Sequence, residues 1–296
     1  MSESLAPEFQ WVPKASAIAE EAGARLREFL AAGVETEYKG DVDLVTVADR
    51  TAEKLIRERL SEAFPGHGIY GEEGTRERLD GEFRWYVDPL DGTTNFAHGL
   101  PQFCVSLGLE QRQEGIEAGQ DGTLVAAVIY DPMRDELFTA ERGKGAWLNG
   151  KPMRVSHTPE LAEALLATGF PSRKRHDSPN VHFYHEFTMR SHGLRRAGSA
   201  ALDLASVASG RIDAFWEFNL NPWDTAAGVL LIEEAGGLVT DFSGGEFKLD
   251  SREVLASNGV IHNELVGLFN DMFAGRGLTP IPTPQEFAQR RAAKAK

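Results

Sequence analysis

Apolar residues recur every three or four positions in two segments near the start of the chain, a spacing typical of amphipathic helices. The first predicted helix carries Ala15, Ile18, Ala19, Ala22, Leu26, Phe29 and Leu30. Gly33 follows, and glycine commonly ends a helix. The second predicted helix carries Ala48, Ala52, Leu55, Ile56, Leu60 and Ala63. The Pro65-Gly66 pair stops it, so each segment predicts a helix with one face turned to a core.

Short apolar runs, typical of buried strands, follow these helices. In the first half they cover residues 83–87, 103–109, 124–130 and 136–139. With the two helices, these runs predict helices packed on a mostly antiparallel sheet. In the second half, strands predicted at 164–168, 214–217 and 238–240 alternate with helices predicted at 199–210 and 222–234. That alternation predicts α/β structure.

The fold class expected from these patterns is α/β, with an α+β first half. A glycine-rich turn region at 143–152 supplies the boundary between an α+β lobe over residues 9–145 and an α/β lobe over 146–275. Residues 276–296 are rich in proline and then basic, so we expect a flexible tail there.

The charge balance narrows the classes of partner. The chain of 296 residues has 45 acidic and 31 basic residues and a net charge of −14. This disfavours nonspecific binding to nucleic acid and to anionic membrane surfaces. An acidic surplus also arises where carboxylates gather to hold cations. The sequence shows no secretory signal and no apolar stretch of membrane length, so we expect a cytoplasmic protein.

The chain contains one cysteine, Cys104, so it forms no intrachain disulfide. Cys104 lies in the apolar run Phe103-Cys104-Val105 and is expected to be a buried small apolar residue. The fold therefore does not depend on oxidation.

The richest chemistry lies at Asp88-Pro89-Leu90-Asp91, where an apolar strand meets a turn. Pro89 forces the turn and removes a donor, so both carboxylates and the Leu90 carbonyl can converge. Gly92-Thr93-Thr94 is typical of a helix start, where backbone N–H groups bind phosphate. Oxygen ligands beside an anion site suit magnesium-dependent phosphoryl chemistry. Alone, the segment also fits a turn that its aspartates merely cap.

Acidic residues mark three further turns. Glu72 lies in Gly71-Glu72-Glu73-Gly74, which alone also fits a solvated acidic loop. Asp224 lies in the first turn of the helix predicted at 222–234, where the helix field favours a carboxylate. Asp49 lies near the start of the second predicted helix. Taken alone, Asp224 and Asp49 also fit ordinary helix-start acids.

Together, these segments resemble the inositol monophosphatase family, within the lithium-sensitive, magnesium-dependent phosphatase superfamily. The matching segments are Gly71-Glu72-Glu73, Asp88-Pro89-Leu90-Asp91-Gly92-Thr93-Thr94-Asn95, Trp223-Asp224-Thr225-Ala226-Ala227-Gly228, Glu234-Ala235-Gly236-Gly237, and Asp43-Leu44-Val45-Thr46 with Asp49. They occur in the family's order and spacing, and the resemblance runs from about Lys39 to Asn258. It implies a layered αβαβα sandwich, a homodimer and inhibition by lithium.

The resemblance also implies roles for individual residues. The metal ligands would be Glu72, Asp88, Asp91 and Asp224 with the Leu90 carbonyl, Glu72 serving catalysis as well. Asp49 and Thr93 would orient and help to deprotonate the attacking water, and the Gly92 and Thr93 amides would hold phosphate oxygens. The first lobe would thus bind metal, and the second would complete the active site. More than one Mg²⁺ ion is implied, with Mn²⁺ as a substitute.

Substrate residues follow from the same resemblance. Glu217, seven residues before Asp224, matches an acid that accepts hydrogen bonds from a sugar alcohol. Ser199 and Ala200 match a substrate-side helix start where the family has threonine in place of Ser199. From the residues alone, Glu217 also fits a strand-end acid and Ser199 an N-cap. Lys39 corresponds to a family lysine near the metals, although its spacing to Asp49 is one residue shorter.

The expected activity is that of a magnesium-dependent phosphomonoesterase acting on inositol 1-phosphate by in-line attack of water. Alternatives are fructose-1,6-bisphosphatase, histidinol-phosphate phosphatase, broad sugar-phosphate phosphatase and, least favoured, a 3′(2′),5′-bisphosphate nucleotidase. A different class also stays open, namely a regulatory or RNA-processing partner on a phosphatase scaffold. The expected partner is a small phosphate ester, with neither membrane nor nucleic acid.

Overall fold

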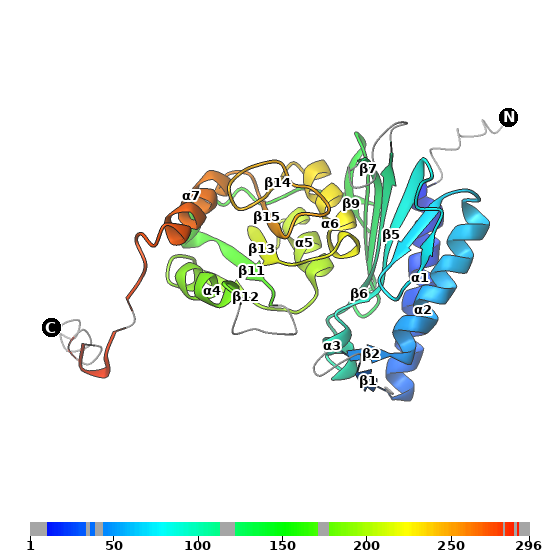
Figure 1. Cartoon of the computed structure of the whole chain (residues 1–296), viewed down its shortest axis with the longest axis horizontal. Coiled ribbons are helices and arrows are strands. Elements are labelled where there is room, and N and C mark those ends of the chain that lie inside the picture. The colour runs from blue at the N-terminus through cyan, green and yellow to red at the C-terminus, as the bar shows by residue number, and fades with distance from the viewer. Residues whose placement is uncertain are drawn as a thin grey trace.

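The computed structural model describes residues 11–33, 36–38, 44–112, 122–170, 178–280, 282–286 and 289. Within these residues the chain forms two large sheets and one short hairpin, with helices between and outside the sheets (Figure 1). The helices are α1 (Trp11–Ala32), α2 (Val47–Ala63), α3 (Thr93–Ala97), α4 (Asn180–Thr188), α5 (Ala200–Ala208), α6 (Pro222–Glu234) and α7 (His262–Phe273), with a short 3₁₀ turn at Leu161–Glu163.

The first large sheet has eight strands in the order β10-β9-β8-β7-β6-β5-β3-β4. The strands are β3 (Gly68–Gly71), β4 (Arg76–Glu77), β5 (Phe83–Asp91), β6 (Cys104–Gln111), β7 (Thr123–Asp131), β8 (Glu136–Glu141), β9 (Gly145–Leu148) and β10 (Lys151–Met153). Every neighbouring pair is antiparallel except β3 and β5, which run parallel. The prediction of a mostly antiparallel first sheet is confirmed.

The second large sheet has five strands in the order β12-β11-β13-β15-β14. The strands are β11 (Leu165–Thr168), β12 (Gly193–Arg195), β13 (Ala214–Phe218), β14 (Leu238–Thr240) and β15 (Glu253–Ser257). Strand β11 runs parallel to β12 and β13, whereas β15 runs antiparallel to β13 and β14. A two-stranded hairpin, β1 (Thr36–Tyr38) and β2 (Leu44–Thr46), precedes α2.

The layers follow the expected αβαβα order (Figure 1). Helices α1 and α2 cover the outer face of the eight-stranded sheet, where Leu26 and Ile56 pack with Trp85. Helices α5 and α6 lie between the two sheets and share one apolar cluster with both. Helices α4 and α7 cover the far face of the second sheet, where Phe187 and Phe269 pack with Trp216. Each layer boundary is therefore closed by apolar burial.

Small residues let α6 approach the first sheet closely. A Cβ at Gly108 of β6 would lie 2.7 Å from the Ala226 Cβ. On the other side of the helix, a Cβ at Gly228 would lie 2.5 Å from the Leu204 Cβ of α5. The absence of side chains at these positions lets α5, α6 and β6 pack together, and this fixes the first turn of α6 beside the end of β5.

The first sheet continues past the boundary expected between residues 145 and 146. That boundary falls at the start of β9, and β10 extends the sheet to Met153. The glycine-rich region contains the turns before and after β9, and in the second of them, between β9 and β10, Asn149 and Gly150 have φ values of 49° and 72°. This is a tight two-residue hairpin turn, because positive φ at both central positions gives the turn a twist that matches the twist of the flanking strands.

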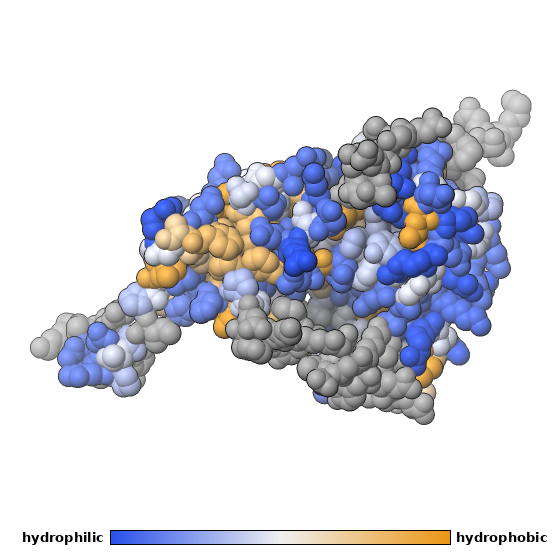
Figure 2. Space-filling view, in the orientation of Figure 1, coloured by the Kyte–Doolittle hydropathy of each residue, from blue (hydrophilic) through white to orange (hydrophobic). Residues whose placement is uncertain are grey.

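The first residues of the expected tail are held against α4. The Thr279 amide donates to Glu186 Oε1 at 2.9 Å, and Arg190 Nη2 donates to the Gly277 carbonyl at 2.7 Å. Hydrophobic residues gather over the lobe that carries α4 and α7, and Val181 and Phe273 are among those exposed there (Figure 2). Among the described helices, none combines the length and the apolar character needed to cross a membrane.

Candidate active site

A pocket of about 180 Å³ opens where the end of β5 meets the starts of α5 and α6. Its wall consists of Glu72, Asp88, Leu90, Asp91, Gly92, Thr93, Thr94, Gly169, Phe170, Arg196, Gly198, Ser199, Ala200, Asp203, Glu217, Leu220 and Asp224. Of the expected site residues that the structure describes, all line this pocket except Asp49, which contacts Thr93. The pocket brings together residues from both halves of the chain.

The end of β5 carries an irregularity that places its two aspartates. Strand β5 pairs Asp88 with Ser106 and Asp91 with Cys104, so the ladder shifts register between them. Pro89 lies in the shifted segment, where the regular ladder is interrupted and the missing N–H of proline is tolerated. The Leu90 amide donates to Asp88 Oδ1 at 3.0 Å, which ties the bulged segment to the carboxylate. Asp88 is 1% exposed, so its charge is buried.

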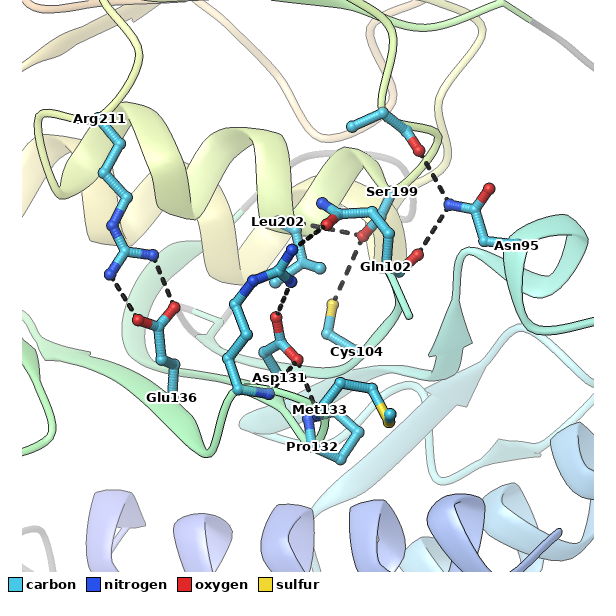
Figure 3. A network of polar contacts seen from close by, with 12 residues as sticks. Asn95, Gln102, Cys104, Asp131, Pro132, Met133, Glu136, Ser199, Leu202 and Arg211 are labelled. Carbon is cyan, nitrogen blue, oxygen red and sulfur yellow. Dashed lines mark hydrogen bonds and ion pairs between the residues drawn. The ribbon is translucent and has the colours of Figure 1, made fainter. Parts of the chain in front are cut away.

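Asp91 is bound to the start of α5. Its Oδ2 accepts hydrogen bonds from the Ser199 hydroxyl at 2.6 Å and from the Ala201 amide at 2.7 Å. Ser199 is the N-cap of α5, and its hydroxyl oxygen accepts from the Leu202 amide (Figure 3). Cys104 Sγ lies 3.8 Å from both Asp91 Oδ2 and Ser199 Oγ. The prediction that Cys104 is buried is confirmed, since it is 0% exposed.

Asp224 and Thr93 occupy helix starts, as predicted. Asp224 is in the first turn of α6, and its Oδ2 accepts from the Asn221 amide at 2.6 Å. Thr93 begins α3, after Gly92 with a φ of 96°. The Thr93 hydroxyl lies 3.2 Å from both Asp49 Oδ1 and the Leu90 carbonyl oxygen, so it donates its proton to one of them at a time. Asp49 is 0% exposed, on the first turn of α2.

The pocket concentrates negative charge in a poorly solvated space. Burial, followed by the charges of Glu72, Asp91 and Asp224, raises the pKa of Asp88 well above its ordinary value. Burial raises the pKa of Asp224 to about 7. Burial also raises the pKa of Asp91, while hydrogen bonds from Ser199 and the α5 amides oppose that rise. Gathered carboxylates of this kind become stable in the ionised form only when cations neutralise them.

The donor set fits hard divalent cations by its chemistry. Carboxylates and the Leu90 carbonyl are the oxygen ligands that Mg²⁺ prefers. In the described ranges, no three His, Cys, Asp or Glu side chains converge closely enough to hold a metal ion as they stand. The residues therefore supply the right atoms and charge, but not a closed cage.

Sequence reasoning missed two charged residues of the pocket. Asp203 is one helical turn after Ser199 on α5, and burial, followed by the charge of Asp91, raises its pKa well above the ordinary value. Arg196 is the one basic side chain among the residues that line the pocket, and it lies over the Phe170 ring at 5.8 Å. The helical spacing from Ser199 could have revealed Asp203, whereas no local pattern marks Arg196.

Asn95 joins the two halves of the site. Its Nδ2 donates to the Gln102 carbonyl at 2.7 Å and to the Ala197 carbonyl at 2.9 Å (Figure 3). Asn95 lies on α3, whereas Ala197 lies just before α5. The sequence motif contains Asn95, but only the fold shows this bridge. Lys39, also expected near the site, and Asp43, which belongs to a segment that matches the family, fall outside the described residues.

The structure thus defines an α/β sandwich with an acidic pocket at the meeting point of its sheets. A model of the inositol monophosphatase family matches residues 10–272. A protein named inositol-1-monophosphatase from Mesorhizobium japonicum is 47% identical over 236 residues, which cover 79% of this chain and 85% of that protein. The chain therefore belongs to the inositol monophosphatase family.

Two further relatives carry another name. A protein of Pseudomonas aeruginosa named Nus factor SuhB is 46% identical over 231 residues, covering 76% of this chain and 82% of that protein. The crystal structure of extragenic suppressor protein suhB from Bartonella henselae superposes with a TM-score of 0.79 at 42% identity, covering 86% of this chain and 95% of that one. The family is one of metal-dependent phosphatases, and its members include proteins named Nus factor SuhB.

Proposed function

We propose that this chain hydrolyses the phosphate monoester of a small polyol, inositol 1-phosphate in particular, with more than one Mg²⁺ ion and with Mn²⁺ as a substitute. The observation that carries the proposal is the group of buried carboxylates around one pocket beside the Gly92-Thr93 helix start. The pKa of Asp88 and that of Asp224 are raised by burial, which is the state expected of a cation site before its cations bind.

Glu72, Asp88, Asp91 and Asp224 would hold the cations together with the Leu90 carbonyl. The cations would supply neutralising charge and lower the pKa of bound water. Asp91 is prepared for this role because Ser199 and the start of α5 fix its orientation. Hydrogen bonds of this kind orient metal ligands in many proteins.

Thr93 and Asp49 would direct the nucleophile. When the Thr93 hydroxyl donates to Asp49, its oxygen lone pairs remain to accept a proton from the attacking water. Asp49 is the acceptor that draws the proton of the Thr93 hydroxyl, so the pair would help to deprotonate the water as it attacks phosphorus in line. The amides of Gly92 and Thr93 would hold the phosphate oxygens.

Glu217 and the start of α5 would select the polyol. Glu217 is 7% exposed and lies against Gly169, where a side chain would collide with its carboxylate. Burial, followed by the charge of Asp203, raises the pKa of Glu217 well above its ordinary value, so it can donate as well as accept hydrogen bonds to hydroxyls. The Ser199 hydroxyl donates to Asp91, so we assign Ser199 to support of the metal ligand and Ala200 to contact with the substrate.

A substrate panel tests the proposal. Phosphate release would be measured with Mg²⁺ from inositol 1-phosphate, fructose 1,6-bisphosphate, histidinol phosphate, a set of sugar phosphates and adenosine 3′,5′-bisphosphate, with and without lithium. We expect inositol 1-phosphate to be preferred, lithium to inhibit, and Asp91→Asn to abolish the release. Preference for another ester keeps the metal chemistry and refutes the role given to Glu217. No release from any ester refutes the proposal for these substrates.

A second function deserves a test because relatives at 46% identity are named Nus factor SuhB. The chain would then act as a regulatory or RNA-processing partner on a phosphatase scaffold. Asp91→Asn in cells separates the two, since a lost activity with an unchanged phenotype favours the partner role. Loss of both favours the enzyme. With either function we propose a cytoplasmic homodimer that binds neither membrane nor, in the enzyme role, nucleic acid.

A further inference from the structure

Glu53 is a buried carboxylate that lies outside the pocket wall. It is on α2, one helical turn after Asp49, and only 4% exposed. No lysine or arginine in the described ranges forms an ion pair with it. Its Oε2 instead accepts from the Glu73 amide at 2.7 Å, and its Oε1 accepts from the Thr75 amide at 2.9 Å. The Thr75 hydroxyl also donates to Oε1, at 2.7 Å.

These three donors belong to one turn, the segment Gly71–Thr75 between β3 and β4. The Gly71 amide donates to the Thr75 carbonyl at 2.9 Å, which closes the turn. Gly71 also lies directly against the Glu53 carboxylate, because a Cβ there would collide with it. Glu53 therefore contacts the backbone immediately before and immediately after Glu72.

A second contact connects the same turn to Asp224. The Arg76 guanidinium donates to the carbonyls of Gly71 and Thr75 and lies 3.9 Å from the centre of the Tyr70 ring. The Trp223 ring meets Tyr70 edge to face at 5.2 Å, with Arg76 5.3 Å from its centre. The Glu72 turn is thus packed against the residue that precedes Asp224.

We propose that Glu53 is a positioning residue, which aims the Glu72 carboxylate at Asp88 by holding the Gly71–Thr75 turn. The geometry supplies the reason, because Glu72 lies between Gly71 and Glu73 and the Glu53 carboxylate contacts the backbone of both. Donation by N–H groups and a hydroxyl also compensates the buried charge of Glu53 without a cation. The inference rests on the proposed function, because Glu72 is there a cation ligand.

Two substitutions disturb this contact from opposite sides. Glu53→Gln keeps the size of the side chain but replaces one acceptor oxygen with an NH₂ group that faces N–H donors. Gly71→Ala pushes a methyl group into the carboxylate, which three hydrogen bonds hold in place. Glu62→Gln is the matched control, since Glu62 is on the same helix with its side chain 71% exposed.

The experiment measures Mn²⁺ and Mg²⁺ binding by calorimetry without substrate, and amide hydrogen exchange across the chain. We expect Glu53→Gln and Gly71→Ala each to weaken cation binding by about 10- to 100-fold, the range seen when groups that orient metal ligands are lost. Exchange should quicken within residues 71–76 but not within residues 88–94. The double variant should weaken binding by much less than the product of the two single effects, because both break one contact. Glu62→Gln should match the wild type.

Folded variants that bind cations as tightly as the wild type would overturn the proposal, as would an additive double variant. If Glu53→Gln fails to fold, Glu53→Asp, which keeps the charge but shortens the reach, and Gly71→Ala decide the question by the same two readouts. A wild-type chain that binds neither cation would refute the proposed function instead. In that case unchanged exchange at 71–76 in the variants would refute the positioning role, and quickened exchange there would support it.

Discussion

Buried carboxylates occur in two regions of this molecule, and their surroundings differ. In the eight-stranded sheet, Glu110 is 0% exposed and its Oε2 accepts from the Arg84 guanidinium at 2.8 and 3.0 Å. In the pocket, Asp88, Asp203 and Glu217 are also buried, yet no lysine or arginine of the described chain forms an ion pair with any of them. Burial raises the pKa of all three well above the ordinary range.

This difference distinguishes a carboxylate with a structural role from carboxylates with a functional role. A buried charge without a partner costs several kcal/mol, so the sheet neutralises its own. The three pocket carboxylates have no such ion-pair partner among the described residues, so their neutralisation requires a bound ligand. The fold is less stable when that ligand is absent. Carboxylates that look alike by burial should therefore respond in opposite ways to loss of their charge.

The largest effect is expected from Asp88→Asn. Without one ligand charge, the rate of phosphate release should fall by about 10³-fold, equivalent to about 4 kcal/mol of transition-state stabilisation. In the metal-free protein the same change should raise the midpoint of thermal unfolding, because a repelled buried charge is removed. Steady-state kinetics and calorimetry of one preparation measure both. A less stable metal-free variant would contradict the distinction between the two regions.

Glu110→Gln should have the opposite profile. It leaves the Arg84 guanidinium buried without its charged partner, and breaking such a pair costs about 3–5 kcal/mol. Because Arg84 is 16% exposed, solvent reduces this toward the lower value. The midpoint of denaturant unfolding measures the loss, with Glu62→Gln as the exposed control. Any large fall in the turnover number of the folded variant would show that Glu110 is not purely structural.

Cation binding should depend on pH through Asp224. Its pKa of about 7 lies above the ordinary value of 3.8, so the folded, metal-free chain holds this proton at pH 6. The unfolded chain has already lost the proton there, so the free energy of unfolding declines as the pH rises from about 4 through 7. Cation binding requires the ionised form and should release protons at pH 6 but few at pH 8.5. Calorimetry in buffers of different ionisation enthalpy measures this release, and the pH dependence should weaken in Asp224→Asn.

The smallest effect is expected from an exposed pair. Arg211 binds Glu136 through two hydrogen bonds of 2.6 Å and joins the loop after α5 to β8 (Figure 3). The Arg211 side chain is 43% exposed, so Glu136→Gln should lower the free energy of unfolding by at most about 1 kcal/mol. Thermal unfolding at low and high salt measures it, and a loss above 2 kcal/mol would place this pair with Glu110.

Local patterns predicted much of this fold, and non-local contacts account for what they missed. The apolar spacing of α1 and α2 and the runs of β5 to β8 are confirmed because each element buries one face. The continuation of the first sheet through β9 and β10 was missed, because a glycine-rich segment is typical both of a hairpin turn and of a boundary between lobes. Asp88, Asp91 and Asp224 were identified as a group through family resemblance. Arg196 and Glu53 were not, because their contacts lie far away along the chain.

The bulge of β5 has a consequence for what the chain tolerates. Residues three apart on a regular strand face opposite sides, yet Asp88 and Asp91 both line the pocket while Leu90 packs against the outer helices. The additional residue in the bulge therefore brings both aspartates to the same face of the strand. Deleting Pro89 would remove the bulge but keep both aspartates on one face, whereas inserting one further residue there would turn the carboxylate of residue 91 into the apolar layer beside Trp85 and Val87. In this short segment the number of residues matters as much as their identity, and insertions there should be among the least tolerated changes in the chain.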